Sequence, residues 1–401
     1  MNKRLLTYTS YLYLMTYAFT VTSIGPCNAP IAHTFNIGER AMGFLISFHF
    51  VGFITSVFYA GYLIDKVGLR QVMLGGVAVL GLSLIGFGQA RSLPVLFVMM
   101  FLSGAGGGAM EASVNALISN LYGRTRVYSL NLLHVYFGVG AFTWPTVAGF
   151  LLHSGVSWRA LYVLIGVISL IIAGLIAMQR FQQVEREEML RFRDMALLLR
   201  NPTVLLLGAA IACYVGAEMG INAWIVRYFD EVLLRGQPLT ARLHVNLGYT
   251  EIDAGLTSSI FLTLYWFTMT VGRIFSTLAG RVVPDTTLLR AMTLLSLITA
   301  IATFITSDYI MAAILLGLTG LFFSGIFATT VAIGGNRFPS NLGIISGIII
   351  GFSALGNIIF NAAIGEIAQA SGLRAAMLFA AALLVIMTLC AFLVRRTRSE
   401  D

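Results

Sequence analysis

The sequence predicts an all-α integral membrane protein, with twelve transmembrane helices arranged as two six-helix halves. Hydrophobic residues make up 58% of the 401 positions and charged residues only 10%, whereas soluble domains carry about 25% charged residues. Apolar runs long enough to cross roughly 30 Å of hydrocarbon recur along the chain. A stretch of the first half also recurs in the second, which supports a division into two similar halves.

Twelve apolar segments are predicted to cross the membrane, each close to the roughly 20 residues that a spanning helix needs. They cover residues 7–31, 41–63, 71–89, 95–119, 129–153, 159–179, 203–229, 256–280, 288–307, 309–335, 342–369 and 373–394. The most charged stretch lies between the sixth and seventh spans and indicates an amphipathic helix on the membrane surface. The predicted domains are an N-terminal half, 1–179, a cytoplasmic linker helix, 180–202, and a C-terminal half, 203–401.

The repeat joins the last three spans of each half. Leu102 to Asn120 aligns with Leu318 to Asn336 at an offset of 216 positions. A Ser-Gly pair follows the fifth span and another follows the eleventh, at Gly155 and Gly372. One polar segment, 230–255, breaks the symmetry, and we expect a solvated insertion there, with a lid as the alternative.

The basic residues predict an orientation. The net charge is +8, but the basic side chains lie in short clusters between apolar runs, which argues against a nucleic-acid-binding face. With the N-terminus in the cytoplasm, most of them fall on the cytoplasmic side, as the positive-inside rule requires. We therefore expect a multi-pass protein of the inner cell membrane with both termini in the cytoplasm. The first apolar run continues to about Ala32, which indicates an uncleaved first span and not a signal peptide.

Several kinds of functional site are not predicted. Cys27, Cys213 and Cys390 lie in or beside apolar runs without close spacing, so we interpret them as small buried side chains. The sequence shows no metal-ligand cluster, no Ser/His/Asp set and no Walker P-loop. We therefore expect no enzymatic activity, no cofactor, no bound metal and no direct use of ATP.

Two carboxylates are predicted deep within spans, Glu111 and Glu218. An ionisable group in mid-membrane costs a few kcal/mol and is a functional-site hypothesis by default. Because burial disfavours the charged form, each could alternate between protonated and ionised states during transport. Glu111 shares a helix face with Gly104, Gly108 and Asn115, and the glycines should let a neighbouring helix pack tightly. The alternative for both acids is a protonated structural group bonded to another span.

Two histidines also lie in predicted spans. His134 could share a proton with Glu111, and a plain interhelical hydrogen bond is an equally good interpretation. For His49 we expect the structural role.

Other polar and aromatic side chains lie near the middle of spans. Amides read hydroxyl groups and aromatic faces stack on C–H surfaces, so the set favours a sugar-like polyol as the solute. A mid-span tryptophan could equally face lipid. The candidate solute-binding residues are Asn115, Asn222, Trp224, Trp266, Asn357 and Asn361.

The loop after the second span carries a motif, Gly61-Tyr-Leu-Ile-Asp65-Lys66-Val-Gly68-Leu-Arg70. It resembles the G-x-x-x-D-R-x-G-R signature of the major facilitator superfamily, with lysine in place of the first arginine. The resemblance implies the twelve-helix facilitator fold and a cytoplasmic gate, in which the aspartate lies at the N-terminus of the eleventh span, where a carboxylate is favoured. The alternative is a solvated loop charge.

Three further stretches resemble the fucose–galactose–glucose:proton symporter family, in its glucose/galactose branch. They are Gly104 to Asn115 in the fourth span, Tyr214 to Trp224 in the seventh, and Tyr265-Trp266 followed by Gly272-Arg273 in the eighth. Asn222 stands where the branch has glycine. In the first span, Pro26 stands where fucose-type members carry the aspartate that takes part in proton coupling, so a two-carboxylate mechanism is in doubt.

These features predict a secondary active transporter whose solute site lies near the bilayer midplane between the halves. The resemblance implies proton-coupled uptake of a hexose-like sugar by alternating access, with sodium as the alternative coupling ion. A proton-driven exporter of amphipathic compounds and a non-transporting membrane sensor are the alternative functions. We expect a monomer whose partners are a small sugar-like solute, protons and the lipid bilayer, and not nucleic acid.

Overall fold

The computed structural model describes residues 3–122, 126–179, 181, 197–234, 254–338 and 342–394, and over these ranges the chain is helical and holds no strand. It divides into two compact units, Met1–Met189 and Leu190–Asp401. The all-α prediction is confirmed for the described residues. The linker helix predicted over 180–202 and the polar segment 230–255 lie largely outside them.

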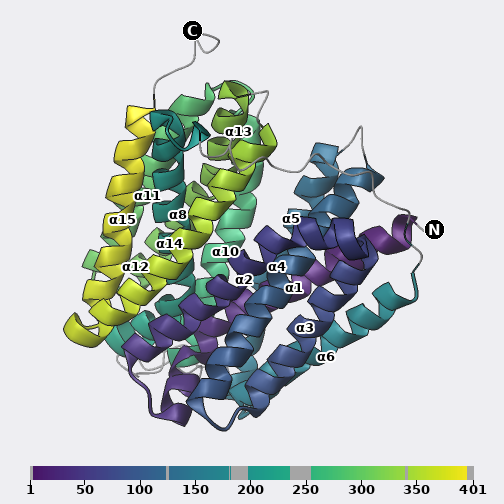
Figure 1. The fold of residues 1–401 in the computed structure, drawn as a ribbon. Coiled ribbons are helices and arrows are strands. Elements are labelled where there is room, and N and C mark those ends of the chain that lie inside the picture. The colour runs from purple at the N-terminus through teal and green to yellow at the C-terminus, as the bar shows by residue number, and fades with distance from the viewer. Residues whose placement is uncertain are drawn as a thin grey trace. The chain divides into compact units, whose positions relative to one another are not determined.

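The first unit contains the purple-to-teal helices of Figure 1. They are α1 (Lys3–Phe35), α2 (Glu39–Val67), α3 (Leu69–Gln89), α4 (Leu93–Leu121), α5 (Arg126–His153) and α6 (Trp158–Ala177). In this unit α4 packs between α2 and α3, α6 packs on α3, and α1 packs on α5.

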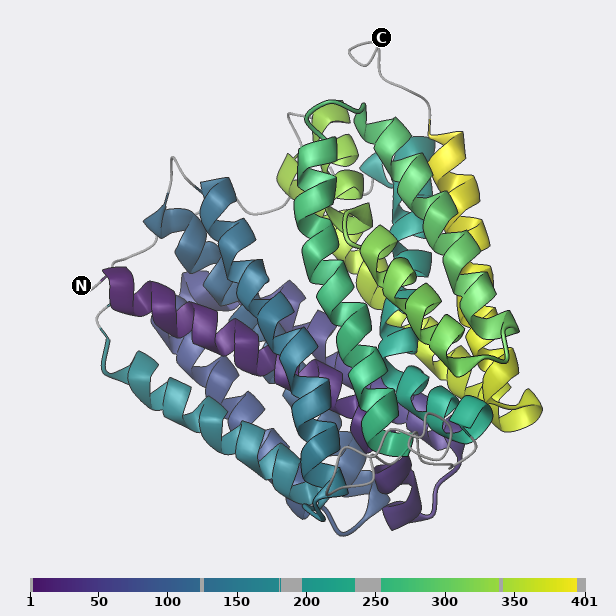
Figure 2. The same ribbon diagram turned by 180° about the vertical axis from the view of Figure 1, so that it is seen from behind.

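The second unit contains the teal-to-yellow helices, which Figure 2 shows from the other side. They are α8 (Pro202–Tyr228), the π-helical turn η2 (Phe229–Leu234), α10 (Ala254–Ala279), α11 (Asp285–Ile305), α12 (Tyr309–Phe323), α13 (Ile326–Arg337), α14 (Leu342–Ser371) and α15 (Leu373–Leu393). Here α8 packs against both α14 and α15, and α12 against α10 and α11.

Every predicted span coincides with helix, and the tenth is divided between α12 and α13 at Ser324–Gly325. Within the described residues, ten helical stretches are long and apolar enough to cross a membrane. The predicted spans 7–31 and 256–280, which form α1 and α10, are not among the ten. In α1 the reason is that buried polar side chains lower the mean hydropathy of the helix without being exposed to lipid. These side chains are Thr7, Thr9, Ser10, Thr16, Thr20, Thr22, Ser23 and Asn28.

The predicted repeat is visible in the packing. A Cβ atom built at Gly104 on α4 would lie 1.8 Å from the carbonyl oxygen of His49 on α2. At the offset of 216, a Cβ at Gly320 on α12 would lie 2.3 Å from the carbonyl oxygen of Tyr265 on α10. Contacts this short require glycine, so each half uses the same residue to bring the same pair of helices together.

The turns repeat as well. Gly155, which precedes α6, and Gly372, which precedes α15, both have φ near +86°. An L side chain rarely adopts this conformation, so glycine is required at both turns. The Ser-Gly pairs found in the sequence therefore mark equivalent turns of the two units.

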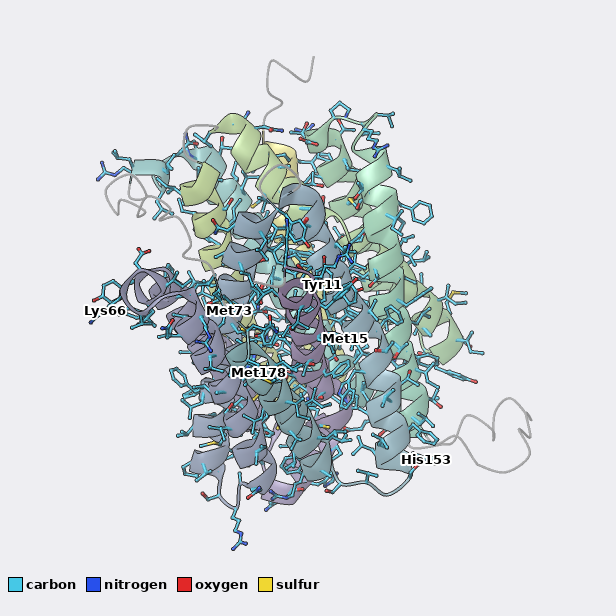
Figure 3. All side chains as sticks on the ribbon, turned by 90° about the vertical axis from the view of Figure 1, so that its right-hand side faces the viewer. Tyr11, Met15, Lys66, Met73, His153 and Met178 are labelled. Carbon is cyan, nitrogen blue, oxygen red and sulfur yellow. The ribbon has the colours of Figure 1, made fainter. Side chains whose placement is uncertain are left out.

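The helix pair α1–α5 shows how aromatic and glycine contacts position α1. The ring of Tyr11 stacks on Tyr136 of α5 at a centroid distance of 4.5 Å. One turn later, the carbonyl oxygen of Met15 lies 2.4 Å from a Cβ built at Gly140. Figure 3 labels Tyr11 and Met15 on this helix. The close approach fixes α1 against α5 and leaves the other faces of α1 to pack on α6, α4 and α2.

Candidate functional site

The second unit carries a cluster of polar side chains built around α8. The phenol of Tyr214 donates a 3.0 Å hydrogen bond to Oε1 of Glu218, one helical turn further along. Glu218 is buried, at 6% exposure, and the guanidinium of Arg273 on α10 acts on it electrostatically. A buried carboxylate needs such partners, because an unpaired charge is costly away from water.

Two predicted solute-binding residues contact each other in this cluster. The indole Nε1 of Trp266 on α10 donates a 2.9 Å hydrogen bond to Oδ1 of Asn222 on α8. Both side chains are buried. This bond fixes which way the Asn222 amide faces, because the carbonyl oxygen must point at the indole.

Among the buried polar atoms of the same unit that have no hydrogen-bond partner in the described residues, four belong to uncharged side chains. They are Nε1 of Trp224, the hydroxyl of Tyr265, and Oδ1 of Asn357 and of Asn361. The amide nitrogen of Asn361 does have a partner, since it donates a 2.9 Å bond to the backbone carbonyl of Asn357. A buried polar group without a partner costs roughly 1–3 kcal/mol, so four in one unit require an explanation.

Contacts place two of these side chains, Asn361 and Tyr265, beside α8. Gly220 on α8 faces α14, where a Cβ built on it would lie 4.0 Å from Oδ1 of Asn361. Tyr265 lies close enough to Glu218 for the two side chains to interact electrostatically, and its ring packs at 5.6 Å against Trp266. The segment of α8 from Glu218 to Trp224 rises about 9 Å. The helix packs against both α10 and α14.

The first unit places Glu111 on α4 among tyrosines of α1. Its carboxylate is half-buried and interacts electrostatically with Tyr13 and Tyr17. Both phenols lie at Gly107, one turn before Glu111. The hydroxyl of Tyr13 donates a 3.1 Å bond to the Gly107 carbonyl, and the ring of Tyr17 lies 2.3 Å from a Cβ built at that glycine.

His49 also belongs to this group, and its hydrogen bonds to two neighbouring helices agree with the structural role that we expected for it. Its Nε2 lies 3.3 Å from the hydroxyl of Tyr17 on α1, and its Nδ1 lies 3.0 Å from Oγ of Ser103 on α4. Sequence reasoning missed Tyr13, Tyr17 and Ser103. The available indication was that the two tyrosines are four residues apart and therefore share a face of α1.

The glycines predicted to let helices pack closely on α4 do so. Gly104 and Gly108 each lie against the backbone of α2, at His49 and Phe53. This confirms the interpretation of the spacing and explains how a bulky imidazole of α2 reaches Ser103.

For the remaining predicted residues, Asn115 and His134, the structure gives the burial of the side chain. Asn115 is half-buried one turn after Glu111, and its part in solute binding stays a prediction. His134 is half-buried on α5, and a shared proton with Glu111 likewise stays a prediction. Within the described ranges, no three His, Cys, Asp or Glu side chains are grouped so that they could hold a metal ion.

The predicted gate motif forms the junction of α2 and α3. Gly68 has φ +95° and its N–H caps α2 by a 2.9 Å bond to the carbonyl of Ile64, so it makes a tight turn between α2 and α3. Lys66 extends from the end of α2 (Figure 3), with its ammonium 5.8 Å from the ring centroid of Tyr62. Arg70 donates to the carbonyl of Ala177 at the end of α6.

At Gly61, the first residue of the motif, no atom of the described residues lies within 4 Å of a Cβ built there. The partner predicted for Asp65, the start of the eleventh span at Ser340–Asn341, lies outside the described residues.

Comparison with known proteins agrees with this architecture. Residues 11–236 match the profile of the Major Facilitator Superfamily. A relative named Protein TsgA homolog, from Edwardsiella ictaluri, is 25% identical over 402 residues, which cover 98% of this chain and 95% of the relative. Two crystal structures share the fold. The nucleoside transporter NupG aligns with a TM-score of 0.76 and 13% identity, over 98% of this chain and all of its own. The Escherichia coli fucose:proton symporter FucP aligns with a TM-score of 0.65 and 18% identity, over 98% of both chains.

Proposed function

Because the chain belongs to the major facilitator superfamily and is a multi-pass secondary transporter and not an enzyme, we propose that it takes up a hexose-like sugar together with protons, by alternating access. We further propose the inner cell membrane as its location, with both termini in the cytoplasm, from the distribution of basic residues.

The observation that carries the proposal is the set of unpaired buried atoms around α8. Two of these atoms, Oδ1 of Asn357 and of Asn361, can only accept hydrogen bonds. Nε1 of Trp224 can only donate, and the hydroxyl of Tyr265 can do both. A sugar hydroxyl is both donor and acceptor, so a solute with several hydroxyls would pair with each of these groups that it reaches. An apolar compound would leave them without partners and would lose the free energy that those bonds contribute.

Aromatic side chains pack beside one of these groups, Tyr265. Tyr265 packs at 5.6 Å against Trp266 and at 6.3 Å against Phe323. Rings beside hydroxyl-binding amides suit a pyranose, which presents hydroxyls at its edge and C–H groups on its faces. The fold shared with FucP, a fucose:proton symporter, is compatible with this solute class.

For proton coupling we propose Glu111 first and Glu218 second. Glu218 has a cationic neighbour, Arg273, and a phenol donor, Tyr214, and both favour a fixed charge state. Glu111 interacts electrostatically with the uncharged phenols of Tyr13 and Tyr17. A carboxylate that is half-buried among neutral groups can gain and lose a proton without breaking an ion pair.

Binding isotherms on the purified protein test the solute class. A thermal-shift screen would first compare D-galactose, D-glucose and L-fucose with a nucleoside, uridine, and a hydrophobic dye. Each of Asn357→Ala, Asn361→Ala and Trp224→Phe removes one unpaired group. We expect each variant to weaken binding of the selected hexose by about two- to tenfold, since a hydrogen bond contributes roughly 0.5–1.5 kcal/mol.

Asn120→Ala is the matched control. Like Asn361, Asn120 donates a hydrogen bond from its amide nitrogen to the backbone carbonyl four residues earlier, at 2.8 Å, but the Asn120 side chain is exposed. The control should bind the hexose as the wild type does. If uridine or the dye binds and no hexose does, or if the three site variants behave like Asn120→Ala, the proposal is wrong.

A further inference from the structure

An ion pair lies close to the indole of Trp224, toward the end of α8. The guanidinium of Arg227 donates from Nε to Oε1 of Glu231 at 2.6 Å, and its Nη2 lies 3.5 Å from Oε2 of the same carboxylate. The guanidinium carbon also lies 5.9 Å from the centroid of the Trp224 ring. Because the three residues are three and four positions apart, they follow one face of α8 and its π-helical continuation η2.

The cation of this pair is more deeply buried than the anion. The side chain of Arg227 is 12% exposed and that of Glu231 41%, whereas Trp224 is fully buried. A guanidinium keeps its charge throughout the physiological pH range, and a charge held away from water needs a partner of opposite sign. Glu231 is such a partner, so the positive charge beside Trp224 is balanced within the chain itself.

Aromatic contacts fix the turn that carries the pair. The ring of Tyr228 packs at 5.5 Å on Phe304 of α11, and its hydroxyl donates a 3.3 Å bond to the Phe304 carbonyl. The ring of Phe229 packs at 4.9 Å on Phe261 of α10. Both rings are buried between the two charged residues of the row. The guanidinium of Arg227 is therefore attached to a turn that is packed against two other helices.

We propose that Glu231 makes the solute site selective for uncharged sugars over sugar acids, an inference that rests on the proposed function of Trp224 as a sugar-binding residue. A sugar that accepts a hydrogen bond from Nε1 of Trp224 lies near the guanidinium of Arg227. Without Glu231, the carboxylate of a sugar acid would pair with that guanidinium, and such charge-assisted bonds are strong.

With Glu231 in place, the carboxylate of a sugar acid is at a disadvantage twice. It finds the guanidinium of Arg227 already bonded, and it meets the like charge of Glu231. Coulomb interactions weaken only as the inverse of the distance, so this repulsion does not require direct contact between the two carboxylates. A neutral hexose meets neither obstacle.

D-galactose and D-galacturonate are the matched probes for this proposal. They differ only at C6, where a carboxylate replaces the hydroxymethyl group, so the remaining hydroxyls can make the same hydrogen bonds. If the wild type selects another hexose, that sugar and its uronic acid take their place. Because like charges placed close together are unfavourable, we expect the wild type to bind galacturonate about tenfold or more weakly than galactose.

The experiment measures binding isotherms for both probes on the purified protein and its variants. Glu231→Gln removes the negative charge and keeps a side chain of the same size. The affinity for galacturonate relative to galactose should rise about tenfold or more, since hydrogen bonds to a charged group are among the strong ones. Glu231→Ala is the second variant, because a glutamine amide can still accept from Arg227 and alanine cannot. The same result is expected.

Asp308→Asn is the matched control. Asp308 belongs to the same unit and is exposed at the start of α12, where its carboxylate accepts a 2.7 Å bond from the N–H of Met311. Asparagine keeps this cap and removes one negative charge, so the variant should keep the wild-type ratio of affinities. In the double variant Arg227→Gln, Glu231→Gln the cation is gone as well, and the relative gain for galacturonate should be lost.

The outcomes separate this inference from the proposed function. If the wild type binds galactose but Glu231→Gln and Glu231→Ala gain no more for galacturonate than Asp308→Asn does, the role of Glu231 is wrong and the proposed function stands. The same conclusion follows if the wild type binds the two probes equally well, or if the double variant keeps the gain. If the wild type binds no hexose, the proposed function fails and this inference fails with it.

Discussion

The close contact between α2 and α4 predicts a large loss of stability for Gly104→Ala. The new Cβ would lie 1.8 Å from the carbonyl oxygen of His49 and 3.0 Å from the backbone nitrogen of Phe53. Ordinary van der Waals contact begins near 3.4 Å, so α2 has to move by about 1.6 Å. A backbone carbonyl cannot rotate away as a side chain can, so the whole helix must shift.

The size of the effect follows from two opposing contributions. Overpacking a well-packed core costs about 1–3 kcal/mol, and a rigid backbone neighbour favours the upper end of that range. In the opposite direction, the higher helix propensity of alanine over glycine stabilises the helix by about 1 kcal/mol. We therefore expect Gly104→Ala to lower the free energy of unfolding by about 2 kcal/mol.

Gly75→Ala on α3 is the matched control, because no atom lies within 4 Å of a Cβ built there. It receives the helix-propensity gain alone and should stabilise the protein by about 0.5–1 kcal/mol. Unfolding of both variants would be followed in the same detergent. The predicted gap is about 3 kcal/mol, roughly a hundredfold in the unfolding equilibrium constant. Equal stability of the two variants would refute the packing that positions His49.

Three further predictions follow from single contacts. Gly68→Ala should destabilise the protein by about 1–3 kcal/mol because φ is +95° there. Gly61→Ala should not, because no atom lies within 4 Å of a Cβ built at that position; chemical denaturation of the two variants would compare their free energies of unfolding. Trp266→Phe removes the hydrogen-bond donor to Asn222 and should lower the free energy of unfolding by about 1–3 kcal/mol. Calorimetry would contradict this if the variant unfolds at the same temperature as the wild type. Glu218→Gln keeps an acceptor for Tyr214 and should reduce sugar accumulation less than Glu111→Gln does, which parallel uptake assays on the two variants would check.

The positions of the spans could be predicted from the sequence because membrane thickness sets the length of each apolar run. The repeat was also visible, since Gly104 and Gly320 are needed for the same contact in each unit. The division of the tenth span into α12 and α13 was not predicted. Both parts are apolar, and hydropathy does not distinguish a continuous helix from an interrupted one.

The candidate site could be predicted only in part. Glu111 and Glu218 stand out because an acid in an apolar run is rare. Tyr17 and Ser103 do not, since tyrosine and serine are common in spans. Their role depends on His49, which lies 32 and 54 positions away from them in the chain. Sequence spacing identifies neighbours on one helix, whereas hydrogen bonds between helices require the packed structure.

The measurement that tests the central claim most directly is sugar accumulation driven by a pH gradient alone. Proteoliposomes with an acidic exterior, no sodium and equal D-galactose on both sides would be compared for the wild type and Glu111→Gln. Our account predicts that the wild type concentrates galactose inside and that protons enter with it. It predicts that Glu111→Gln, which mimics only the protonated carboxyl, exchanges galactose across the membrane but does not concentrate it. Wild-type protein that fails to concentrate the sugar, or a glutamine variant that concentrates it equally well, would contradict proton-coupled uptake through Glu111.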